Sequence, residues 1–217
     1  NQTHIKDLQS MVAADCISTG ESVLDLHAKD QSRHAPCRPE VVIWPLKASE
    51  VAAILNYANE NLIPVTGWGS GSSLEGNPIP IKKGIVLDFS QMNRILEIRE
   101  EDFQADVEPG VVYQDLNRKL RHTGLFFPPD PGARATVGGM IANNSSGARV
   151  PVYGTTADHI LSQEIVLADG STQLAEAIVA NVDVATVYQK LLPDTPANRR
   201  RLSRLSKVEP SCSGFIL

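Results

Sequence analysis

The stretch Val65–Gly76, VTGWGSGSSLEG, has the composition of an anion-binding loop. Gly67, Gly69 and Gly71 occupy every second position immediately after the apolar run Ile63–Val65. Glycine reaches backbone angles that are closed to other residues, and it lets main-chain amides approach a ligand closely. The spacing therefore predicts a loop that wraps a phosphate, and a flexible surface turn is the alternative that the glycines alone leave open.

This stretch matches neither of the two common phosphate-binding motifs. A Rossmann fingerprint needs the pattern G-x-G-x-x-G, but the sixth position counted from Gly67 holds Ser72, and the pattern also fails from Gly69. A Walker loop ends in a lysine followed by serine or threonine, and the stretch contains no lysine. The predicted donors are therefore backbone amides and the hydroxyls of Ser70, Ser72 and Ser73.

A second segment, Pro128–Gly147, consists mainly of turn residues and small side chains, PPDPGARATVGGMIANNSSG. A loop of that length inside a compact domain is uncommon unless it binds something or is disordered. The flanking stretches Leu125–Phe127 and Ile160–Leu167 read as buried segments, which disfavours disorder. We therefore expect an ordered channel lined by small residues.

Short strands and helices must position these two segments. Residues 49–60 read as an amphipathic helix after the possible cap Ser49, because apolar residues recur at i, i+3, i+4 and i+7 from Val51. This helix is expected to pack on a sheet that contains Val41–Trp44 and Ile63–Thr66.

Further strands and one further helix are predicted downstream. The strands are Ile85–Phe89, Ile95–Ile98 and Phe103–Val107, followed by a helix from Tyr113 that stops at a glycine cap, Gly124, and by a hairpin of Ile160–Ala168 and Thr172–Ile178 that turns at Asp169-Gly170. From the residues alone, the fold class is α+β with several short strands.

Composition excludes several classes of function. The chain has 217 residues, 42% of them hydrophobic, which is enough for one sizeable core or for two small cores that share a boundary. The net charge of −5 gives no general attraction to nucleic acid or to acidic membranes. No apolar run approaches the ~20 residues of a membrane span, and Asn1–Gly20 lacks the layout of a signal peptide.

Cysteines and histidines give no sign of a metal site. Cys16, Cys37 and Cys212 form no C-x-x-C pair, so we expect reduced thiols in the cytoplasm rather than a zinc site or a redox disulfide. His27 and His34 are too few ligands for a metal without Asp25 or Asp30, and we expect none.

A series of short motifs extends the pattern from about residue 20 to about residue 178. In order they are Pro45 with the helix after it, Leu74-Glu75-Gly76, Val107-Glu108-Pro109-Gly110-Val111, Asp130-Pro131-Gly132, Thr136-Val137-Gly138-Gly139, Ser146-Gly147, Tyr153-Gly154-Thr155 and Val166-Leu167-Ala168-Asp169-Gly170. Each is weak alone, but their ordered succession is specific. Through them the chain resembles the FAD-binding domain of vanillyl-alcohol-oxidase (PCMH) type flavoproteins, in the branch of D-lactate dehydrogenases, glycolate oxidase FAD subunits and D-2-hydroxyglutarate dehydrogenases.

The resemblance implies a cofactor site. In relatives the glycine loop holds the FAD pyrophosphate through backbone amides, and the segment after it lies along the rest of the cofactor. Small side chains would leave room for the flat ring system, and Thr136, Asn144 and Ser146 would supply hydrogen bonds. The implied cofactor-binding residues are Thr66, Gly67, Trp68, Gly69, Ser70, Gly71, Ser72, Ser73, Gly76, Asp130, Pro131, Gly132, Thr136, Gly138, Gly139, Ala142, Asn143, Asn144, Ser146, Gly147, Tyr153, Ile165 and Val166.

Some relatives attach the flavin covalently through a histidine in or next to the glycine loop. The nearest histidines in this sequence are His34 and His122, so non-covalent FAD is expected. No catalytic base can be named. Arg149 and Tyr153 are the best candidates to lie near the ring system, with a surface arginine and a buried structural tyrosine as alternatives, and His159 reads as a structural histidine.

The resemblance also implies a domain plan. Residues 1–180 would form a two-lobed FAD-binding domain, with lobes roughly 20–110 and 111–180. Residues 181–217 would be the helical start of a truncated cap or linker region, with a basic surface helix over 184–206. Full-length relatives continue with a substrate-binding cap domain, so the cap is expected to be absent and the chain to be a fragment.

The implied activity is that of the FAD-binding portion of an oxidoreductase. Such an enzyme oxidises a 2-hydroxy acid of the D-lactate or glycolate type, transfers a hydride to FAD and passes electrons to an acceptor that is unknown. Two alternatives are a non-catalytic truncated flavin-binding module and an enzyme like the UDP-N-acetylenolpyruvoylglucosamine reductase. The oligomeric state is not predicted.

Overall fold

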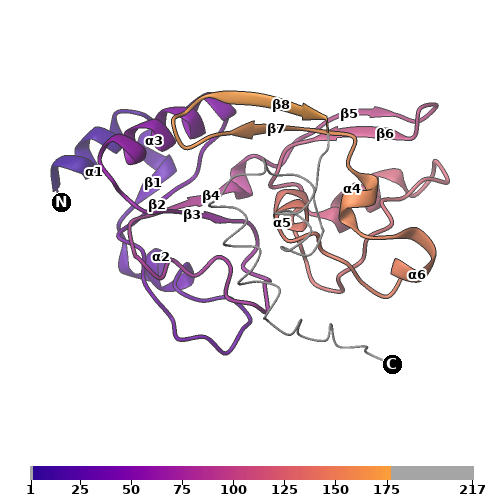
Figure 1. Cartoon of the computed structure of the whole chain (residues 1–217), viewed down its shortest axis with the longest axis horizontal. Helices are drawn as coiled ribbons and strands as arrows, with labels where there is room; N and C mark the ends of the chain where they lie inside the picture. The colour runs from indigo at the N-terminus through magenta and orange to yellow at the C-terminus, as the bar shows by residue number, and fades with distance from the viewer. Residues whose placement is uncertain (1, 177–217) are drawn as a thin grey trace, which may run out of the picture. The chain divides into compact units, whose positions relative to one another are not determined.

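The computed structural model describes residues 2–176, which belong to one compact unit, Asn1–Ala177 (Figure 1). The predictions for 177–217, including the basic helix and the domain boundary near residue 180, lie outside the described residues.

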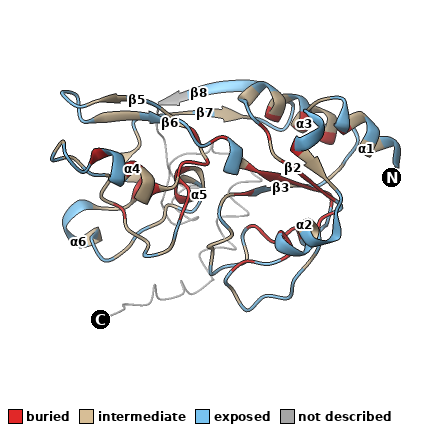
Figure 2. Cartoon of the chain, turned by 180° about the vertical axis from the view of Figure 1, so that it is seen from behind, coloured by how far each residue is buried: buried red, intermediate tan, exposed pale blue. Residues whose placement is uncertain are grey.

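A four-stranded sheet forms the first part of the fold. Its strands are β1 (Ile17–Ser18), β2 (Val41–Ile43), β4 (Ile85–Asp88) and β3 (Val65–Trp68), in that spatial order. β1 is antiparallel to β2, whereas β2, β4 and β3 are parallel to one another. The two strands predicted to share this sheet do share it, with β4 between them. Figure 2 shows β2 as a buried strand, as expected when both faces of a parallel sheet are covered.

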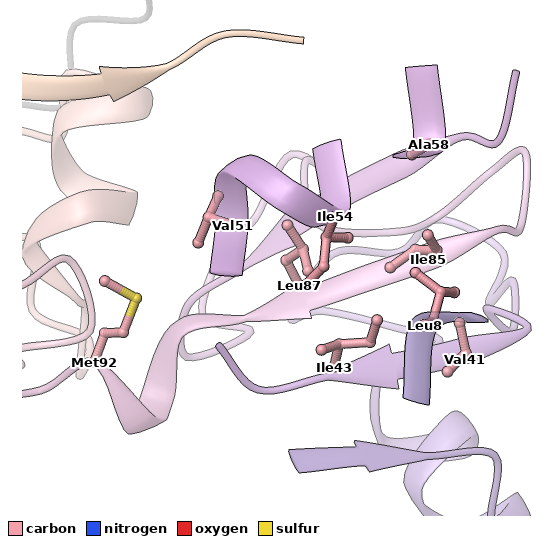
Figure 3. Packing of buried hydrophobic residues seen from close by; sticks show 9 residues of the cluster. All are labelled: Leu8, Val41, Ile43, Val51, Ile54, Ala58, Ile85, Leu87 and Met92. Carbon is pink, nitrogen blue, oxygen red and sulfur yellow. The ribbon is translucent and has the colours of Figure 1, made fainter. Parts of the chain in front are cut away.

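Helix α3 (Ala48–Glu60) packs on this sheet through its predicted apolar stripe. Val51, Ile54 and Ala58 are buried, and they meet Ile85 from β4 and Leu8 from α1 (Gln2–Gln9) in the first hydrophobic core (Figure 3). The recurrence at helical spacing places these side chains on one face, and their burial supplies most of the stabilisation of the helix.

A second hydrophobic core lies further along the chain. Helix α4 (Tyr113–Leu120) contributes Leu116 and Leu120 to it, and helix α5 (Val137–Ala142) contributes Val137. The antiparallel strands β5 (Ile95–Arg99) and β6 (Gln104–Val107) pack against the same cluster.

The predicted hairpin is present as β7 (Ser162–Val166) and β8 (Thr172–Glu176). Its loop spans residues 167–171, and Gly170 donates its backbone N–H to Leu167 O at 2.9 Å. Strand β7 lies against α3, and Val166 packs on the first core. The remaining elements are the helices α2 (Glu21–Leu26) and α6 (Val150–Tyr153) and the 3-10 helices η1 (Ala14–Cys16), η2 (Phe89–Gln91) and η3 (Thr156–His159).

Several predicted boundaries are wrong at the ends of elements. Helix α3 begins at Ala48, so Ser49 is not its cap, and the Glu50 carboxylate accepts the Leu46 backbone N–H instead at 2.8 Å. Strand β3 begins two residues later than predicted, at Val65, because Pro64 has no N–H to give to a strand ladder. Gly67 and Trp68 are therefore strand residues rather than loop residues.

Two further boundaries differ for local reasons. Phe103 is not in a strand, because it adopts a φ of 56° in the turn before β6 and is 79% exposed. Helix α4 ends at Leu120, four residues before Gly124, and the Thr123 hydroxyl donates to Leu120 O at 2.8 Å.

The interpretation of Pro128–Gly147 as one long loop with buried flanks is also wrong. The segment contains helix α5, which begins after the cap Thr136. In the flanks, Phe126 is 41% exposed and Leu161 is 64% exposed. The second flank belongs to a two-stranded hairpin, so apolar residues there are not enclosed by neighbouring strands. None of the described helices is long and apolar enough to span a bilayer.

Candidate functional site

The glycine loop leaves strand β3 and exposes a run of backbone amides. Within the part of the chain that the structure describes, the N–H groups of residues 70–74 donate to no protein acceptor. The loop turns at Gly71, whose φ of +64° is unfavourable for any residue with a side chain. Consecutive free amides on a turn of this kind form an anion-binding concavity.

The end of the loop is fastened to a segment that precedes the sheet. Asp30 is buried, and its carboxylate accepts the backbone N–H groups of Ser32 at 2.9 Å and Gly76 at 2.8 Å. Burial alone would raise the pKa of Asp30, but these hydrogen bonds hold it below its ordinary value. Gln31 N–H donates to Ser73 O at 3.0 Å. The carboxylate therefore stays ionised and fixes where the loop ends.

The structure brings the glycine loop and the second segment together. The Ser70 hydroxyl donates to Arg134 O at 2.6 Å. A Cβ added to Gly69 would overlap with the Thr136 hydroxyl. Asn143 accepts a hydrogen bond from Asn77, which follows the loop. Segments about 65 positions apart in the sequence thus form one surface.

The first turn of α5 is not part of the free amide surface. Val137 N–H donates to Val111 O at 2.8 Å, and Gly138 N–H donates to Pro109 O at 2.8 Å. The Thr136 hydroxyl caps the helix by accepting the Gly139 N–H at 3.4 Å. Since these donors are already used, an anion has donors at the glycine loop and not at this helix end.

Asp130 organises the start of the second segment. Its carboxylate accepts the Tyr113 hydroxyl at 2.6 Å and Gly132 N–H at 3.2 Å, and Arg149 lies 3.6 Å away. The Tyr113 hydrogen bond is the main cause that lowers the pKa of Asp130. Burial, together with Asp130, raises the pKa of Tyr113 to about 12, so the phenol keeps its proton and donates it. Gly147 lies against this turn, because a Cβ there would overlap with Asp130 O.

Other residues of the second segment have structural partners. Asn144 adopts a φ of 45°, and its side-chain oxygen accepts Ala157 N–H at 2.8 Å. That oxygen is therefore engaged within the chain, and the amide nitrogen remains as the group with which Asn144 can reach a ligand. Ser146 and Ala142 are exposed.

Arg149 and Tyr153 share a cluster with Phe126. The Arg149 guanidinium carbon lies 5.4 Å from the centre of the Phe126 ring, and the Tyr153 ring meets Phe126 edge to face at 5.3 Å. Tyr153 is 44% exposed, so the alternative of a buried structural tyrosine is wrong. His159 has a structural partner, as expected, because its Nε2 lies 2.7 Å from Tyr153 O.

The remaining predicted site residues lie in strands β7 and β3 or in the turn at Asp130. Ile165 and Val166 are in β7, and Val166 packs on the first core rather than on the glycine loop. Thr66 and Gly67 lie in β3 before the free amides begin, and Pro131 lies next to Asp130 in the same turn.

Sequence reasoning missed a neighbour of the glycine loop. His34 is 42 positions from Gly76, yet a Cβ on Gly76 would lie 2.6 Å from His34 Cδ2. A cavity of about 430 Å³ opens beside it, and its lining residues are Gln31, Ser32, Arg33, His34 and Leu74. The hydrogen bonds from Gly76 N–H to Asp30 and from Gln31 N–H to Ser73 O, which join distant segments, bring these residues to the loop.

No metal site is formed by the described residues, since none of their His, Cys, Asp and Glu side chains gather in groups of three or more with suitable geometry. His27 and Asp30, weighed as ligands from the sequence, lie in hydrogen bonds to Asp88 and to backbone N–H groups.

Tyr113→Phe should lower the stability of the fold, because it removes the hydroxyl that donates to the Asp130 carboxylate. We expect a loss of about 1 kcal/mol of unfolding free energy at neutral pH, because the carboxylate loses a hydrogen bond. The folded pKa of Asp130 is depressed, so this stabilisation exists above the unfolded pKa of about 3.9 and disappears as pH falls through the folded value. Urea unfolding at neutral and acid pH measures both effects.

Tyr153→Phe is the matched control, because the Tyr153 hydroxyl has no hydrogen-bond partner among the described residues. It should change the unfolding free energy by less than about 0.5 kcal/mol at either pH. A loss for Tyr113→Phe that is equally large in acid would contradict the role of the ionised carboxylate.

These features fit a dinucleotide with a diphosphate. The loop carries a run of free amides, which can bind phosphate without a lysine, and small residues line the adjoining segment. FAD has such a diphosphate between a flat ring system and an adenosine.

Comparison with known proteins agrees with this geometry. Residues 39–175 match the family model described as FAD binding domain. The chain is 36% identical over 167 residues to the "Probable D-lactate dehydrogenase, mitochondrial" of Danio rerio, covering 77% of this chain and 34% of that protein. It is 40% identical over 147 residues to "Glycolate oxidase subunit GlcD" of Bacillus subtilis (strain 168), covering 67% of this chain and 31% of that protein.

The fold also matches solved structures. The structure of p-cresol methylhydroxylase with substrate bound superposes with a TM-score of 0.67 at 20% identity, covering 80% of this chain and 35% of that chain. The predicted α+β fold of the PCMH type is therefore confirmed. The chain spans about a third of the length of the curated relatives described above. With a family model that matches most of the described residues, the chain belongs to the FAD-binding-domain family.

Proposed function

We propose that this chain binds FAD with the diphosphate on the backbone amides of residues 70–74. The observation that carries the proposal is the run of N–H groups that have no acceptor among the described residues, on a loop that turns at Gly71. A diphosphate would accept these donors without a cationic side chain in the loop.

The rest of the cofactor would follow the second segment. The contacts of Ser70 with Arg134 and of Asn77 with Asn143 support this path, because they join the loop to that segment. We assign the remaining predicted residues of the loop and the second segment to the cofactor on the same ground, and Ile165 and Val166, which lie in β7, on the resemblance of the sequence.

We further propose that the chain is the FAD-binding part of an oxidoreductase for 2-hydroxy acids. The names of the relatives, a D-lactate dehydrogenase and a glycolate oxidase subunit, favour this class over the reductase alternative. When bound, the flavin would accept a hydride from the α-carbon of the hydroxy acid. The residues described here would bind and orient it, and none is assigned as a base.

The domain plan is part of the proposal. Residues 1–180 would be the FAD-binding domain, with lobes roughly 20–110 and 111–180. Separate hydrophobic cores support two lobes, but β5 and β6 pack on the second core, so these cores do not mark a boundary at residue 110. We also propose a cytoplasmic location, supported by Cys16 and Cys37, which are free thiols. The electron acceptor and the oligomeric state are left open.

Binding can be tested with ligands that carry the diphosphate and with one that lacks it. We expect the flavin fluorescence of FAD to be quenched when FAD binds to the chain, and ADP to compete with FAD. Riboflavin should bind far more weakly, because it lacks the diphosphate. Equal binding of riboflavin and FAD would exclude the amide loop as the phosphate site.

The class of reaction needs a second experiment. Anaerobic bleaching of bound flavin by D-lactate or glycolate, but not by NADPH, would separate a hydroxy-acid enzyme from the reductase and from a non-catalytic module.

The flavin should be bound without a covalent bond. Acid precipitation of the yellow complex should leave all of the flavin in the supernatant, because the glycine loop contains no histidine. His34 is the residue to control for, since it lies beside Gly76. A pellet that stays yellow in the unaltered chain and becomes colourless in His34→Ala would refute non-covalent binding.

A further inference from the structure

His27 is a buried histidine whose two ring nitrogens both face hydrogen-bond acceptors. It follows helix α2 and is 1% exposed. Nδ1 lies 2.8 Å from the carbonyl oxygen of Val23, and Nε2 lies 3.0 Å from Oδ2 of Asp88. A carbonyl oxygen can only accept, so Nδ1 must carry a proton.

The Asp88 carboxylate is also an acceptor. It is 6% exposed, and it receives Trp44 Nε1–H at 2.8 Å and Ser90 N–H at 2.8 Å in addition to His27. Burial opposes its ionisation, but these hydrogen bonds hold the pKa of Asp88 below its ordinary value. Val23 O and Asp88 Oδ2 thus hold both ring nitrogens of His27, which fixes the orientation of the imidazole ring.

The His27 ring lies directly beside Trp68. The two ring centres are 4.7 Å apart with an interplanar angle of 54°, within the range of an aromatic contact. The ring of Trp44 meets His27 edge to face at 6.0 Å. Asp88 is the one charged side chain found in contact with the His27 ring among the described residues.

Trp68 in turn supports the glycine loop. It is 7% exposed, and its register in β3 sets it opposite Asp88 in β4. A Cβ on Gly71 would lie 2.6 Å from Cζ2 of Trp68, so the backbone of Gly71 rests on the indole. The position of the indole therefore decides where the free amides of the loop lie.

We propose that His27 is a positioning residue for the diphosphate of FAD. Its imidazole ring, held by Asp88 and Val23, fixes the Trp68 indole, and the indole fixes the turn at Gly71. This inference rests on the proposed function. It assigns to the loop a buried histidine that acts through the aromatic ring of Trp68, from outside the loop itself.

The test separates positioning from simple folding stability. His27→Gln leaves the buried Asp88 carboxylate without its histidine partner, so it should lower stability. The double variant His27→Gln with Asp88→Asn removes that unpaired charge and should recover much of the stability. We expect the Kd for FAD to rise about tenfold in both variants, because neither has an imidazole ring against Trp68. His122→Gln is the control, at an exposed histidine that accepts a hydrogen bond from Arg121, and it should leave the Kd for FAD unchanged.

A spectroscopic readout tests the indole itself. The chain has two tryptophans, so 5-fluorotryptophan labelling gives two ¹⁹F resonances, which Trp44→Phe assigns. The Trp68 resonance should shift when FAD binds to the unaltered chain, and in both His27 variants its position without ligand should differ from that in the unaltered chain.

Three results would overturn the inference. The first is a double variant that binds FAD as tightly as the unaltered chain, which would make His27 structural only. The second is a Trp68 resonance that does not move when FAD binds. The third is an unaltered chain that binds no FAD, which would overturn the proposed function together with this inference, whereas the first two leave the proposed function standing.

Discussion

Gly71→Ala is expected to raise the Kd for FAD at least about tenfold, equivalent to about 1.4 kcal/mol of binding free energy. The added methyl would lie 2.6 Å from Cζ2 of Trp68. The indole is buried and cannot rotate away, so the loop must move and take its free amides with it. The left-handed backbone at Gly71 adds about 1–2 kcal/mol of lost folding stability. Flavin fluorescence titration and urea unfolding measure the two losses separately.

Gly124→Ala is the matched control for that variant. Gly124 has a φ of +79°, so an alanine there meets the same backbone penalty, but no atom lies within 4 Å of the added methyl. We expect a similar loss of stability and an unchanged Kd for FAD. If the two variants weakened FAD binding equally, the contact between Gly71 and Trp68 would not be the cause.

Gly147→Ala is expected to lower the unfolding free energy by about 3 kcal/mol. Its added Cβ would overlap with the backbone carbonyl of Asp130, and no side-chain rotation can relieve a clash with backbone. One of the two segments must move, which would also separate Asp130 from Arg149. Denaturant unfolding gives the loss of stability, and FAD titration should show weakened binding.

Gly67→Ala is the control for Gly147→Ala, because its added methyl meets no clash. Its Cβ would lie 3.7 Å from Phe89 Cε2, which is ordinary van der Waals contact. Its unfolding free energy should remain within about 0.5 kcal/mol of that of the unaltered chain. An equally stable Gly147→Ala would show that the turn at Asp130 can shift freely, contrary to the close packing described here.

Much of the local fold follows from the sequence because its signals are periodic. The stripe that begins at Val51 predicts helix α3, and the apolar run from Ile85 predicts strand β4. The turn residues Asp169 and Gly170 predict the β7–β8 hairpin. Each of these patterns is read within one short window, where the spacing of side chains determines which face is buried.

The ends of elements and the helix inside the second segment were not predictable in that way. Helix α5 begins after Thr136 because the carbonyl oxygens of Val111 and Pro109 accept the first N–H groups of the helix. Helix α5 contains the adjacent glycines Gly138 and Gly139, and glycine has a weak intrinsic preference for a helix, so the local pattern reads as a loop. The contacts that stabilise α5 come from residues more than 20 positions away.

The sequence by itself determined that a glycine loop without lysine would present backbone amides, and that small residues would follow in a second segment, because both depend on which side chains are missing. Only the tertiary structure decided which groups stand behind that loop. Asp30, His34 and the His27–Asp88 pair come from positions 42 to 61 residues away from their partners, and no periodicity in the chain records such contacts. The physical reason is that the parallel strands β2, β4 and β3 bring distant strand ends to one edge of the sheet, where a buried charge and an aromatic ring can meet.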